Sequence, residues 1–318
     1  MDSVKVVLTD QVFPTVDVER EILGRAGGTL EILPDSSPET IRAEAADADA
    51  ILTTYAAIDA GTVAALKSCK VIARYGIGVD NIDLEAARAA GITVTNVPDY
   101  CVEEVADHTV ALLLAVWRKV VTGNEVVRKG GWGIAELRPV RRLRGRQLGM
   151  IGFGHIGRAV ASRATTFGLE LRVFDPYIDD SALAGTGVTR IEDLDELLSS
   201  SDIVTIHAPL TSGTKGLVDA GAIDKMKDGA VLINTSRGPI VDTSAVAAAL
   251  GGGKLSGAGL DVFDEEPPDS ATLQSLETLV ATPHAAFYSD EAIAESQTKA
   301  ATSIVTVLGG DEPDYRVV

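Results

Sequence analysis

Short apolar runs rich in β-branched residues alternate with longer amphipathic stretches along most of this chain. In the first hundred residues, the apolar runs fall at 4–8, 50–54, 70–74 and 92–97. A second series follows a Gly- and Arg-rich connection, with runs at 147–152, 171–175, 202–207, 230–235, 255–262 and 278–284. This alternation predicts repeated βα units, in which helices cover a parallel sheet.

Two amphipathic stretches predict longer helices, at 102–121 and 289–310. In the first, inward positions recur with a helical period. These positions are Val102, Val105, Thr109, Leu112, Leu113, Val116 and Val120. Pro98 marks a break just ahead of this helix, and Ser289 and Asp290 are the expected caps of the second.

The two series of apolar runs predict two doubly wound parallel-sheet domains. Residues 1–99 form the first part of a smaller domain, and 100–285 form a larger one. We expect the C-terminal helix within 286–318 to return to the smaller domain, which makes that domain discontinuous. A chain of 318 residues is long enough to fill two cores of ordinary size.

Composition narrows the classes of function. The net charge of −18 weighs against binding to nucleic acid, because phosphates would repel most of the surface. No apolar run is long enough to span a membrane, and the N-terminus lacks the pattern of a secretory signal, so we expect a cytoplasmic protein.

Cys69 and Cys101 lack metal-ligand spacing and are expected to be packed thiols. The basic run at 138–146 is either an anion or partner site or a solvated loop.

The strongest local motif is a glycine-rich turn. Gly152, Gly154 and Gly157 follow an apolar run and open an amphipathic stretch, and Asp175 ends the next run. Gly152 allows a tight turn, Gly154 lets a pyrophosphate approach the backbone, and Gly157 lets the helix pack on the sheet. Asp175 would accept the adenosine ribose hydroxyls and repel a 2′-phosphate, which favours NAD over NADP. The motif predicts a Rossmann domain; the alternative is a structural turn.

Three chemically apt residues follow the ends of successive runs in the second series. Arg237, Glu266 and His284 each come directly after a predicted strand, and ligands of open α/β sheets bind beyond the carboxyl ends of strands. A histidine paired with a carboxylate can move the proton that accompanies hydride transfer, and an arginine can hold an anionic substrate. Taken singly, Arg237 could form a surface ion pair, Glu266 could be a solvated acid, and His284 could be a capped loop histidine.

Five motifs together resemble the D-isomer-specific 2-hydroxyacid dehydrogenase family, which includes 3-phosphoglycerate, glyoxylate/hydroxypyruvate and formate dehydrogenases. The matching motifs are NVPDYCVEEVADHTVALLL, LGMIGFGHIG, NTSRGPIVD, GLDVFDEEP and TPHAA. Within the family, TPHAAFYSDEA resembles the C-terminal-binding protein branch of NAD-binding transcriptional corepressors, although Phe287 stands where those proteins usually carry tryptophan. The resemblance implies a Rossmann NAD-binding domain and a smaller flavodoxin-like substrate domain.

The resemblance also implies roles for individual residues. Arg237 would bind the carboxylate and carbonyl of the substrate, His284 would move the proton, and Glu266 would hold His284 in its protonated form. Glu266 rather than Glu265 matches the acid of the family, because it directly precedes Pro267. From the smaller domain the substrate would meet Arg74 and the backbone of Gly76, Ile77 and Gly78, with Phe287 beside its side chain. The positions that would line the NAD groove are Thr109, His155, Ile156, Asp175, His207, Pro209, Thr235, Ser236 and Asp261.

These expectations combine into one hypothesis: an NAD-dependent D-2-hydroxyacid dehydrogenase that acts chiefly as a 2-oxoacid reductase, without a catalytic metal. The active site would lie in the cleft between the domains, with hinges near 98–100 and 285–288. The resemblance implies a homodimer, with the helix after Pro98 and the following loop at the interface. The alternative is an NAD-sensing, corepressor-like interaction protein, since those corepressors keep the same arginine, glutamate and histidine.

Overall fold

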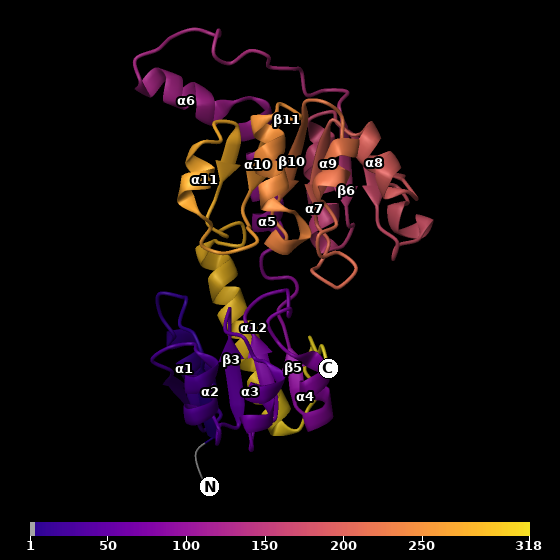
Figure 1. Ribbon diagram of the computed structural model, residues 1–318. Helices are drawn as coiled ribbons and strands as arrows, with labels where there is room; N and C mark the ends of the chain where they lie inside the picture. The colour runs from indigo at the N-terminus through magenta and orange to yellow at the C-terminus, as the bar shows by residue number, and fades with distance from the viewer. Residues whose placement is uncertain (1–3) are drawn as a thin grey trace. The chain divides into compact units, whose positions relative to one another are not determined.

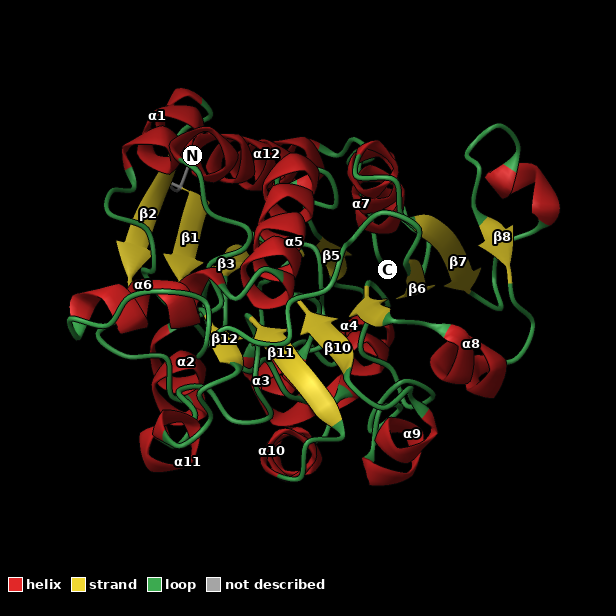
Figure 2. Ribbon diagram, turned by 90° about the horizontal axis from the view of Figure 1, so that it is seen from above, coloured by secondary structure: helices red, strands yellow, loops and turns green. Residues whose placement is uncertain are grey.

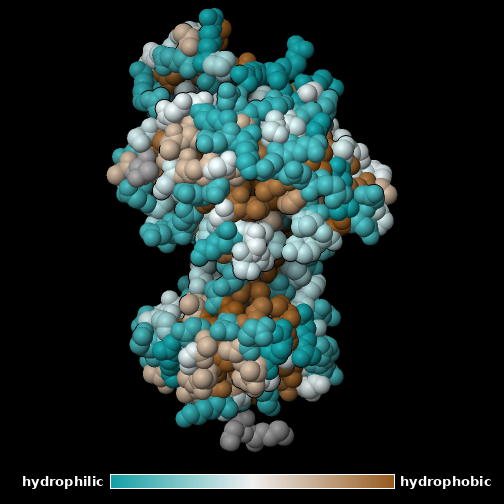
Figure 3. Space-filling model, turned by 45° about the vertical axis from the view of Figure 1, so that its right-hand side comes forward, coloured by the Kyte–Doolittle hydropathy of each residue, from teal (hydrophilic) through white to brown (hydrophobic). Residues whose placement is uncertain are grey.

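Two parallel sheets organise the chain. The computed structural model describes residues 4–318, and the chain separates into two units. The smaller unit runs to Cys101 and resumes with Ser289–Val318, and the larger unit is Val102–Tyr288. Figure 1 colours both units by residue number. Hydrophilic residues cover most of the surface seen in Figure 3.

The smaller unit holds a five-stranded parallel sheet in the order β2-β1-β3-β4-β5. This is the flavodoxin-like strand order that the resemblance implied. Its elements are β1 (Val4–Leu8), α1 (Asp17–Arg25), β2 (Gly28–Ile32), α2 (Pro38–Glu44), β3 (Ala50–Thr53), α3 (Ala60–Ala65), β4 (Val71–Arg74), α4 (Leu84–Ala90), β5 (Thr93–Thr95) and α12 (Asp290–Gly309). Strand β2 is absent from the apolar runs of the sequence, because at this edge of the sheet its side chains alternate between half-buried and exposed.

The C-terminal helix α12 belongs to the smaller unit, where it packs against α1 and β4. Ser289 caps it by accepting a hydrogen bond from the N–H of Ala292 at 2.9 Å. Gly310 ends it in the left-handed region, with φ of 92°. The chain therefore returns to the sheet that it built first.

The larger unit holds a seven-stranded parallel sheet in the order β12-β11-β10-β9-β6-β7-β8. The order reverses between β6 and β9, as in a Rossmann sheet, which confirms the predicted fold class. Its elements are α5 (Val102–Trp117), α6 (Val120–Arg128), β6 (Gln147–Ile151), α7 (His155–Thr166), β7 (Glu170–Phe174), η1 (Asp180–Leu183), β8 (Thr189–Arg190), α8 (Leu194–Ser200), β9 (Ile203–Ile206), α9 (Ala220–Lys225), β10 (Ala230–Asn234), η2 (Gly238–Ile240), α10 (Thr243–Gly251), β11 (Leu255–Leu260), α11 (Ser270–Gln274) and β12 (Leu279–Ala281).

Helices cover both faces of this larger sheet. One core lies under α5 and α7, and a second lies under α8, α9 and α10. Figure 2 shows α5 and α7 on one side of the strands and α9 and α10 on the other. With both faces covered, β9 and β10 are buried along their whole length, which explains why they read as unbroken apolar runs.

The predicted end of the helix at 102–121 is wrong. Helix α5 stops at Trp117, and Lys119 adopts a left-handed conformation with φ of 52° before α6 begins. The turn redirects the chain, so Val120 is 57% exposed instead of continuing the buried stripe. The indole N–H of Trp117 donates to the carbonyl of Arg141 at 2.9 Å, which anchors the end of α5 to the loop ahead of β6.

The docking of α12 on the smaller unit predicts a position-dependent loss of stability. Ile304 on α12 is fully buried, whereas its neighbour Val305 is half-buried. Ile304→Ala should lower the free energy of unfolding by about 2–5 kcal/mol, and Val305→Ala by less than about 1.5 kcal/mol, because only the first leaves a closed cavity. Urea unfolding followed by circular dichroism measures both, and equal losses would contradict this placement of α12.

Candidate active site

The glycine-rich turn joins β6 to α7 and leaves open space at one glycine. Gly152 has φ of 95°, and a Cβ there would come within 2.7 Å of the carbonyl oxygen of His207. A Cβ at Gly157 would lie 2.6 Å from the carbonyl oxygen of Gly152. Above Gly154, a Cβ would meet no described atom within 4 Å. The first and third glycines thus serve close packing, and the second leaves its backbone accessible to a ligand.

The N-terminus of α7 has the properties of an anion site. Gly154 is its N-cap, and no described side chain accepts a hydrogen bond there. His155 is exposed in the first turn, and Ile156 packs its side chain against the core. The N–H groups of a first turn lack partners within the helix and carry the positive end of its dipole. This end can therefore receive a phosphate of a dinucleotide.

Asp175 is held by the backbone of the same turn. One of its carboxylate oxygens accepts the N–H of Phe153 at 2.9 Å, and the other accepts the N–H of Tyr177 at 2.9 Å. Each oxygen has a second lone-pair site, so the carboxylate can still accept hydroxyl groups. The bond to Phe153, which the sequence did not reveal, also ties the end of β7 to the glycine turn.

His207 lies behind the glycine turn, at the end of β9. Burial lowers the pKa of His207 to about 3, so its ring is neutral at physiological pH. Its Nε2 lies 3.1 Å from the hydroxyl of Thr205. The neighbouring Pro209 is exposed, and its carbonyl accepts the hydroxyl of Thr214 at 2.6 Å. His207 therefore supports the turn with its backbone and adds no positive charge.

Asn234 organises the loop that carries Arg237. The side chain of Asn234 is fully buried; it donates to the carbonyl of Arg237 at 3.0 Å and accepts the N–H of Ser236 at 3.0 Å. The hydroxyl of Ser236 donates to the carbonyl of Ala208. The hydroxyls of Thr235 and Thr109 lie 2.8 Å apart, which links the loop to α5. Sequence reasoning missed Asn234, whose only signal was a carboxamide at the end of an apolar run.

The loops that follow β10 and β11 touch at Gly238. A Cβ on Gly238 would overlap the carbonyl of Phe263, so only glycine allows this close approach. The contact brings the loop of Arg237 against the loop of Glu266. The charge of Arg237 is one of the influences that lower the pKa of Glu266.

Glu266 and His284 form a hydrogen-bonded pair. Nδ1 of His284 lies 2.8 Å from Oε2 of Glu266, and the N–H of Phe263 donates to Oε1 of Glu266 at 3.0 Å. Partial burial acts to raise the pKa of Glu266, but the hydrogen bond and charge of His284, together with the N–H of Phe263 and the charge of Arg237, hold that pKa below its usual 4.5. Since Nδ1 faces the carboxylate, Nε2 is the ring nitrogen directed away from it.

The backbone at His284 is unusual and is held by Asp261. His284 has φ of 52°, a conformation that non-glycine residues adopt only when their surroundings impose it. Asp261 is 1% exposed; its carboxylate accepts the N–H groups of Ala285 and Ala286 at 2.9 Å each, and its carbonyl accepts the N–H of His284 at 2.8 Å. Asp261 was expected to line the NAD groove, and its contacts show that it shapes the loop of the histidine.

His108 joins this network from α5. Its Nε2 lies 2.9 Å from the hydroxyl of Thr282 and 3.7 Å from Oδ1 of Asp261. Thr282 in turn donates to Asp261. Both partners lie more than 150 residues away from His108 along the chain, so no local pattern of the sequence could reveal these contacts.

A pocket of about 390 Å³ lies beside the Glu266–His284 pair. Apart from those two residues, it is lined mainly by apolar side chains. The lining residues are Phe263, Glu266, Pro267, Pro268, Leu273, Ala281, Thr282, Pro283 and His284. Phe287 lies near the same histidine, with the two ring centroids 6.2 Å apart and nearly perpendicular.

In the smaller unit, Arg74 is fixed at the end of β4. Its Nε donates to the carbonyl of Thr54 at 3.2 Å, and a Cβ on Gly76 would overlap its guanidinium. The carbonyl of Gly76 accepts the N–H of Val97 at 3.1 Å, and that of Ile77 accepts the side chain of Asn96 at 2.7 Å. Gly78 is half-buried. The expected substrate loop, Arg74–Gly78, is therefore a well-held segment of this unit.

Three further features bear on function. Within the described part of the chain, no group of three or more His, Cys, Asp or Glu side chains could hold a metal ion. Across residues 4–318, no helix is both long and apolar enough to cross a membrane. The basic run at 138–146 is a largely exposed loop ahead of β6.

A family model and curated relatives both match this chain. Residues 110–286, more than half of the chain, match the family model "D-isomer specific 2-hydroxyacid dehydrogenase, NAD binding domain". The chain is 34% identical to the D-3-phosphoglycerate dehydrogenase of Methanocaldococcus jannaschii over 310 residues, which are 97% of this chain and 58% of that protein. It thus spans about half the length of the curated relatives that it matches.

Among the solved structures that resemble the whole chain are a D-lactate dehydrogenase and a glyoxylate reductase. A D-lactate dehydrogenase from Aquifex aeolicus, complexed with NAD and lactic acid, has a TM-score of 0.90 at 29% identity, with 99% of both chains covered. A glyoxylate reductase from Paecilomyes thermophila has a TM-score of 0.91 at 28% identity and covers 100% of this chain and 99% of its own. The family match, the strand orders and the glycine turn agree, and the chain belongs to the D-isomer-specific 2-hydroxyacid dehydrogenase family.

Proposed function

We propose that this chain is an NAD-dependent D-2-hydroxyacid dehydrogenase that acts chiefly as a 2-oxoacid reductase. The observation that carries the proposal is the 2.8 Å pairing of His284 with Glu266. It lies beyond the carboxyl ends of neighbouring strands, on the same sheet as a glycine turn with open space at Gly154. Proton transfer and dinucleotide binding are thereby supported in one unit.

The turn and its neighbours fit a dinucleotide. The N–H groups at the start of α7 would bind the pyrophosphate, and Asp175 would accept the ribose hydroxyls. Thr109, Thr235 and Ser236 belong to the loop network that would line the nicotinamide end. NADH bound there supplies the hydride.

The side chains beyond β10, β11 and β12 would carry the remaining steps. Arg237 would bind the substrate carboxylate and polarise its carbonyl. His284 would donate a proton from Nε2 to the carbonyl oxygen as the hydroxyl group forms. Glu266, already deprotonated because its pKa lies below 4.5, would stabilise the imidazolium until that transfer.

The smaller unit would serve as the substrate domain. Arg74 and the backbone of Gly76, Ile77 and Gly78 would bind the carboxylate end, and Phe287 would contact the side chain of the oxoacid. The named relatives act on different 2-hydroxy or 2-oxo acids, so we propose a small 2-oxo or 2-hydroxy acid as the class of substrate. Those relatives are named as dehydrogenases and a reductase, so the corepressor-like alternative is not favoured. The cytoplasmic location stays a prediction.

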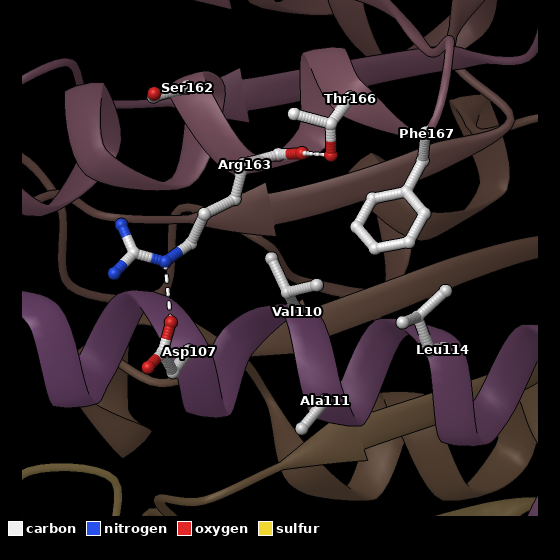
Figure 4. Close-up of a pocket in the computed structure, with 8 residues that line it drawn as sticks. All are labelled: Asp107, Val110, Ala111, Leu114, Ser162, Arg163, Thr166 and Phe167. Atoms are coloured by element: carbon white, nitrogen blue, oxygen red, sulfur yellow. Dashed lines mark hydrogen bonds and ion pairs between the residues drawn. The ribbon is translucent and has the colours of Figure 1, made fainter.

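We also propose a homodimer that uses the groove between α5 and α7. The groove has a volume of about 510 Å³ and is lined by Asp107, Val110, Ala111, Leu114, Ser162, Arg163, Thr166 and Phe167. Val110 and Leu114 point toward Phe167, and Asp107 pairs with Arg163 beside them (Figure 4). In the same unit, α6 and the loop after it expose Val127, Trp132 and Ile134. Apolar surface of this kind marks an interface, and a second copy offers the complementary set.

The assembly is testable with one charged substitution. Ala111 is exposed on the groove wall, so Ala111→Glu should place an unpaired charge in the interface and shift the protein toward monomers. Ala220→Glu, on the exposed start of α9, is the matched control and should leave the mass unchanged. Sedimentation equilibrium measures the mass; a monomeric parent would refute the dimer.

Cofactor choice follows from Asp175. Its carboxylate is fixed by two backbone N–H groups at 2.9 Å, so a 2′-phosphate would meet a negative charge that cannot move away. NADH should be preferred over NADPH by at least about tenfold in kcat/KM, which corresponds to about 1.4 kcal/mol. Asp175→Ala should reduce that ratio, whereas Glu170→Gln at the exposed start of β7 should not. Equal kcat/KM for both cofactors in the parent would contradict this role.

The proton-transfer pair is tested with NADH and a panel of small 2-oxoacids. His284→Ala should lower turnover by about two to four orders of magnitude, the usual contribution of a positioned acid, while NADH still binds. Glu266→Gln keeps the shape of the side chain and removes its charge. Because the pKa of Glu266 is lowered from 4.5, the carboxylate is ionised throughout the neutral range and favours the imidazolium there. The alkaline limit of reduction should therefore move to lower pH in Glu266→Gln.

Glu265→Gln is the control for that shift, since Glu265 is the exposed neighbour of the paired acid. Its pH–rate profile should match the parent. An unmoved alkaline limit in Glu266→Gln would show that another group sets the protonation of His284. Absence of turnover with every oxoacid in the panel would overturn the proposed function itself.

A further inference from the structure

A fully buried carboxylate lies inside the smaller unit, against the residue that follows Arg74. Glu19 on α1 is 0% exposed, and the hydroxyl of Tyr75 donates to it at 2.7 Å. The amide of Gln297 on α12 donates to both oxygens of Glu19, at 3.0 and 3.1 Å, and to the carbonyl of Thr15 at 2.7 Å. Among the described residues, no lysine or arginine forms an ion pair with Glu19. Burying a carboxylate is costly unless hydrogen bonds satisfy it, and here two side chains supply them.

Tyr75 is held at three points by this arrangement. Its hydroxyl binds Glu19, its ring packs edge-on against Phe13 with centroids 5.2 Å apart, and its carbonyl accepts the hydroxyl of Ser296 from α12. Burial and the charge of Glu19 raise the pKa of Tyr75 well above 10, so the hydroxyl keeps its proton as a donor. A residue fixed at its hydroxyl, its ring and its carbonyl leaves the adjoining backbone little freedom.

The fixed residue lies inside the loop proposed to bind substrate. Tyr75 separates Arg74 from Gly76, so its position sets where the guanidinium and the following N–H groups lie. Ser296 comes twelve positions after His284, on the helix that begins directly after the loop of that histidine. The helix that holds Tyr75 is therefore the continuation of the segment that carries the proton donor.

We propose that Glu19, Tyr75, Ser296 and Gln297 form a positioning cluster that fixes the Arg74–Gly78 loop to α12 in the geometry that receives the 2-oxoacid. This inference rests on the proposed function for the role of the loop. All four residues are buried, so they act on substrate binding through the backbone on either side of Tyr75. Apolar residues could fill the same volume without the cost of burying a carboxylate, whereas hydrogen bonds also fix direction. Removing one of these hydrogen bonds should disturb the geometry of the loop and, because a buried group then loses a partner, also lower the stability of the unit.

The test compares matched serines on one helix and adds the tyrosine. Ser296→Ala removes the bond to the carbonyl of Tyr75, whereas Ser303→Ala removes a bond of a buried serine to its own helix, to the carbonyl of Lys299. Tyr75→Phe removes only the hydroxyl that binds Glu19. The readouts are KM and kcat for an oxoacid reduced by the parent, the Kd for NADH, the midpoint of urea unfolding, and hydrogen exchange of the Ile77 and Gly78 amides.

Ser296→Ala and Tyr75→Phe should each raise the oxoacid KM about tenfold, as expected for small misplacements of a binding group. They should change kcat less, leave the Kd for NADH within about twofold, and speed exchange of the Ile77 and Gly78 amides. Ser303→Ala should match the parent in KM and in that exchange. If the first two variants lower the unfolding midpoint without changing KM or exchange in the loop, the cluster is only structural and the proposal is overturned.

The two proposals fail in different ways. If the parent reduces no oxoacid, the proposed function is wrong, and hydrogen exchange still decides whether the cluster holds the loop. If the parent is active and both variants behave like Ser303→Ala, the function stands and the positioning cluster is refuted.

Discussion

The candidate site depends on one buried carboxylate. Asp261 follows β11, is almost completely enclosed, and accepts two successive backbone N–H groups from the segment after β12. A buried carboxylate that lost these donors would be unsatisfied, which costs more than the bonds themselves contribute. The segment is therefore held close to Asp261, with His284 in its left-handed conformation. The orientation of the imidazole toward Glu266 follows from that constraint.

The same principle recurs at other strand ends. In the smaller unit, Asp10 follows β1 and accepts the N–H groups of Thr54 and Tyr55, at 2.9 and 2.6 Å, from the loop after β3. In the larger unit, Asn234 at the end of β10 accepts the N–H of Ser236 and donates to the carbonyl of Arg237 in the loop that follows. Loops have no repeating hydrogen-bond pattern of their own, so polar side chains at strand ends satisfy their backbone groups. A parallel sheet thus extends its rigidity into the loops that hold the candidate site.

Close packing supplies what hydrogen bonds alone cannot. Gly238 lets the loop of Arg237 approach the backbone of Phe263, and Gly152 lets the glycine turn approach His207. In both places a methyl group would separate segments whose polar atoms must stay near one another. The glycines and the buried acids are complementary, because the first allow the approach of neighbouring loops and the second fix their direction.

The sequence by itself determined the two parallel sheets, the glycine turn and the order of Arg237, Glu266 and His284 after successive strands. These features rest on local patterns, namely burial on both faces of a strand, backbone freedom at glycine, and the rule that parallel strands end at one edge. Only the tertiary structure decided that α5 ends before Lys119, that His108 joins Asp261, and that Glu19 holds Tyr75. Each of these depends on how residues distant in the chain pack and satisfy one another's polar groups. A local sequence pattern cannot predict such contacts.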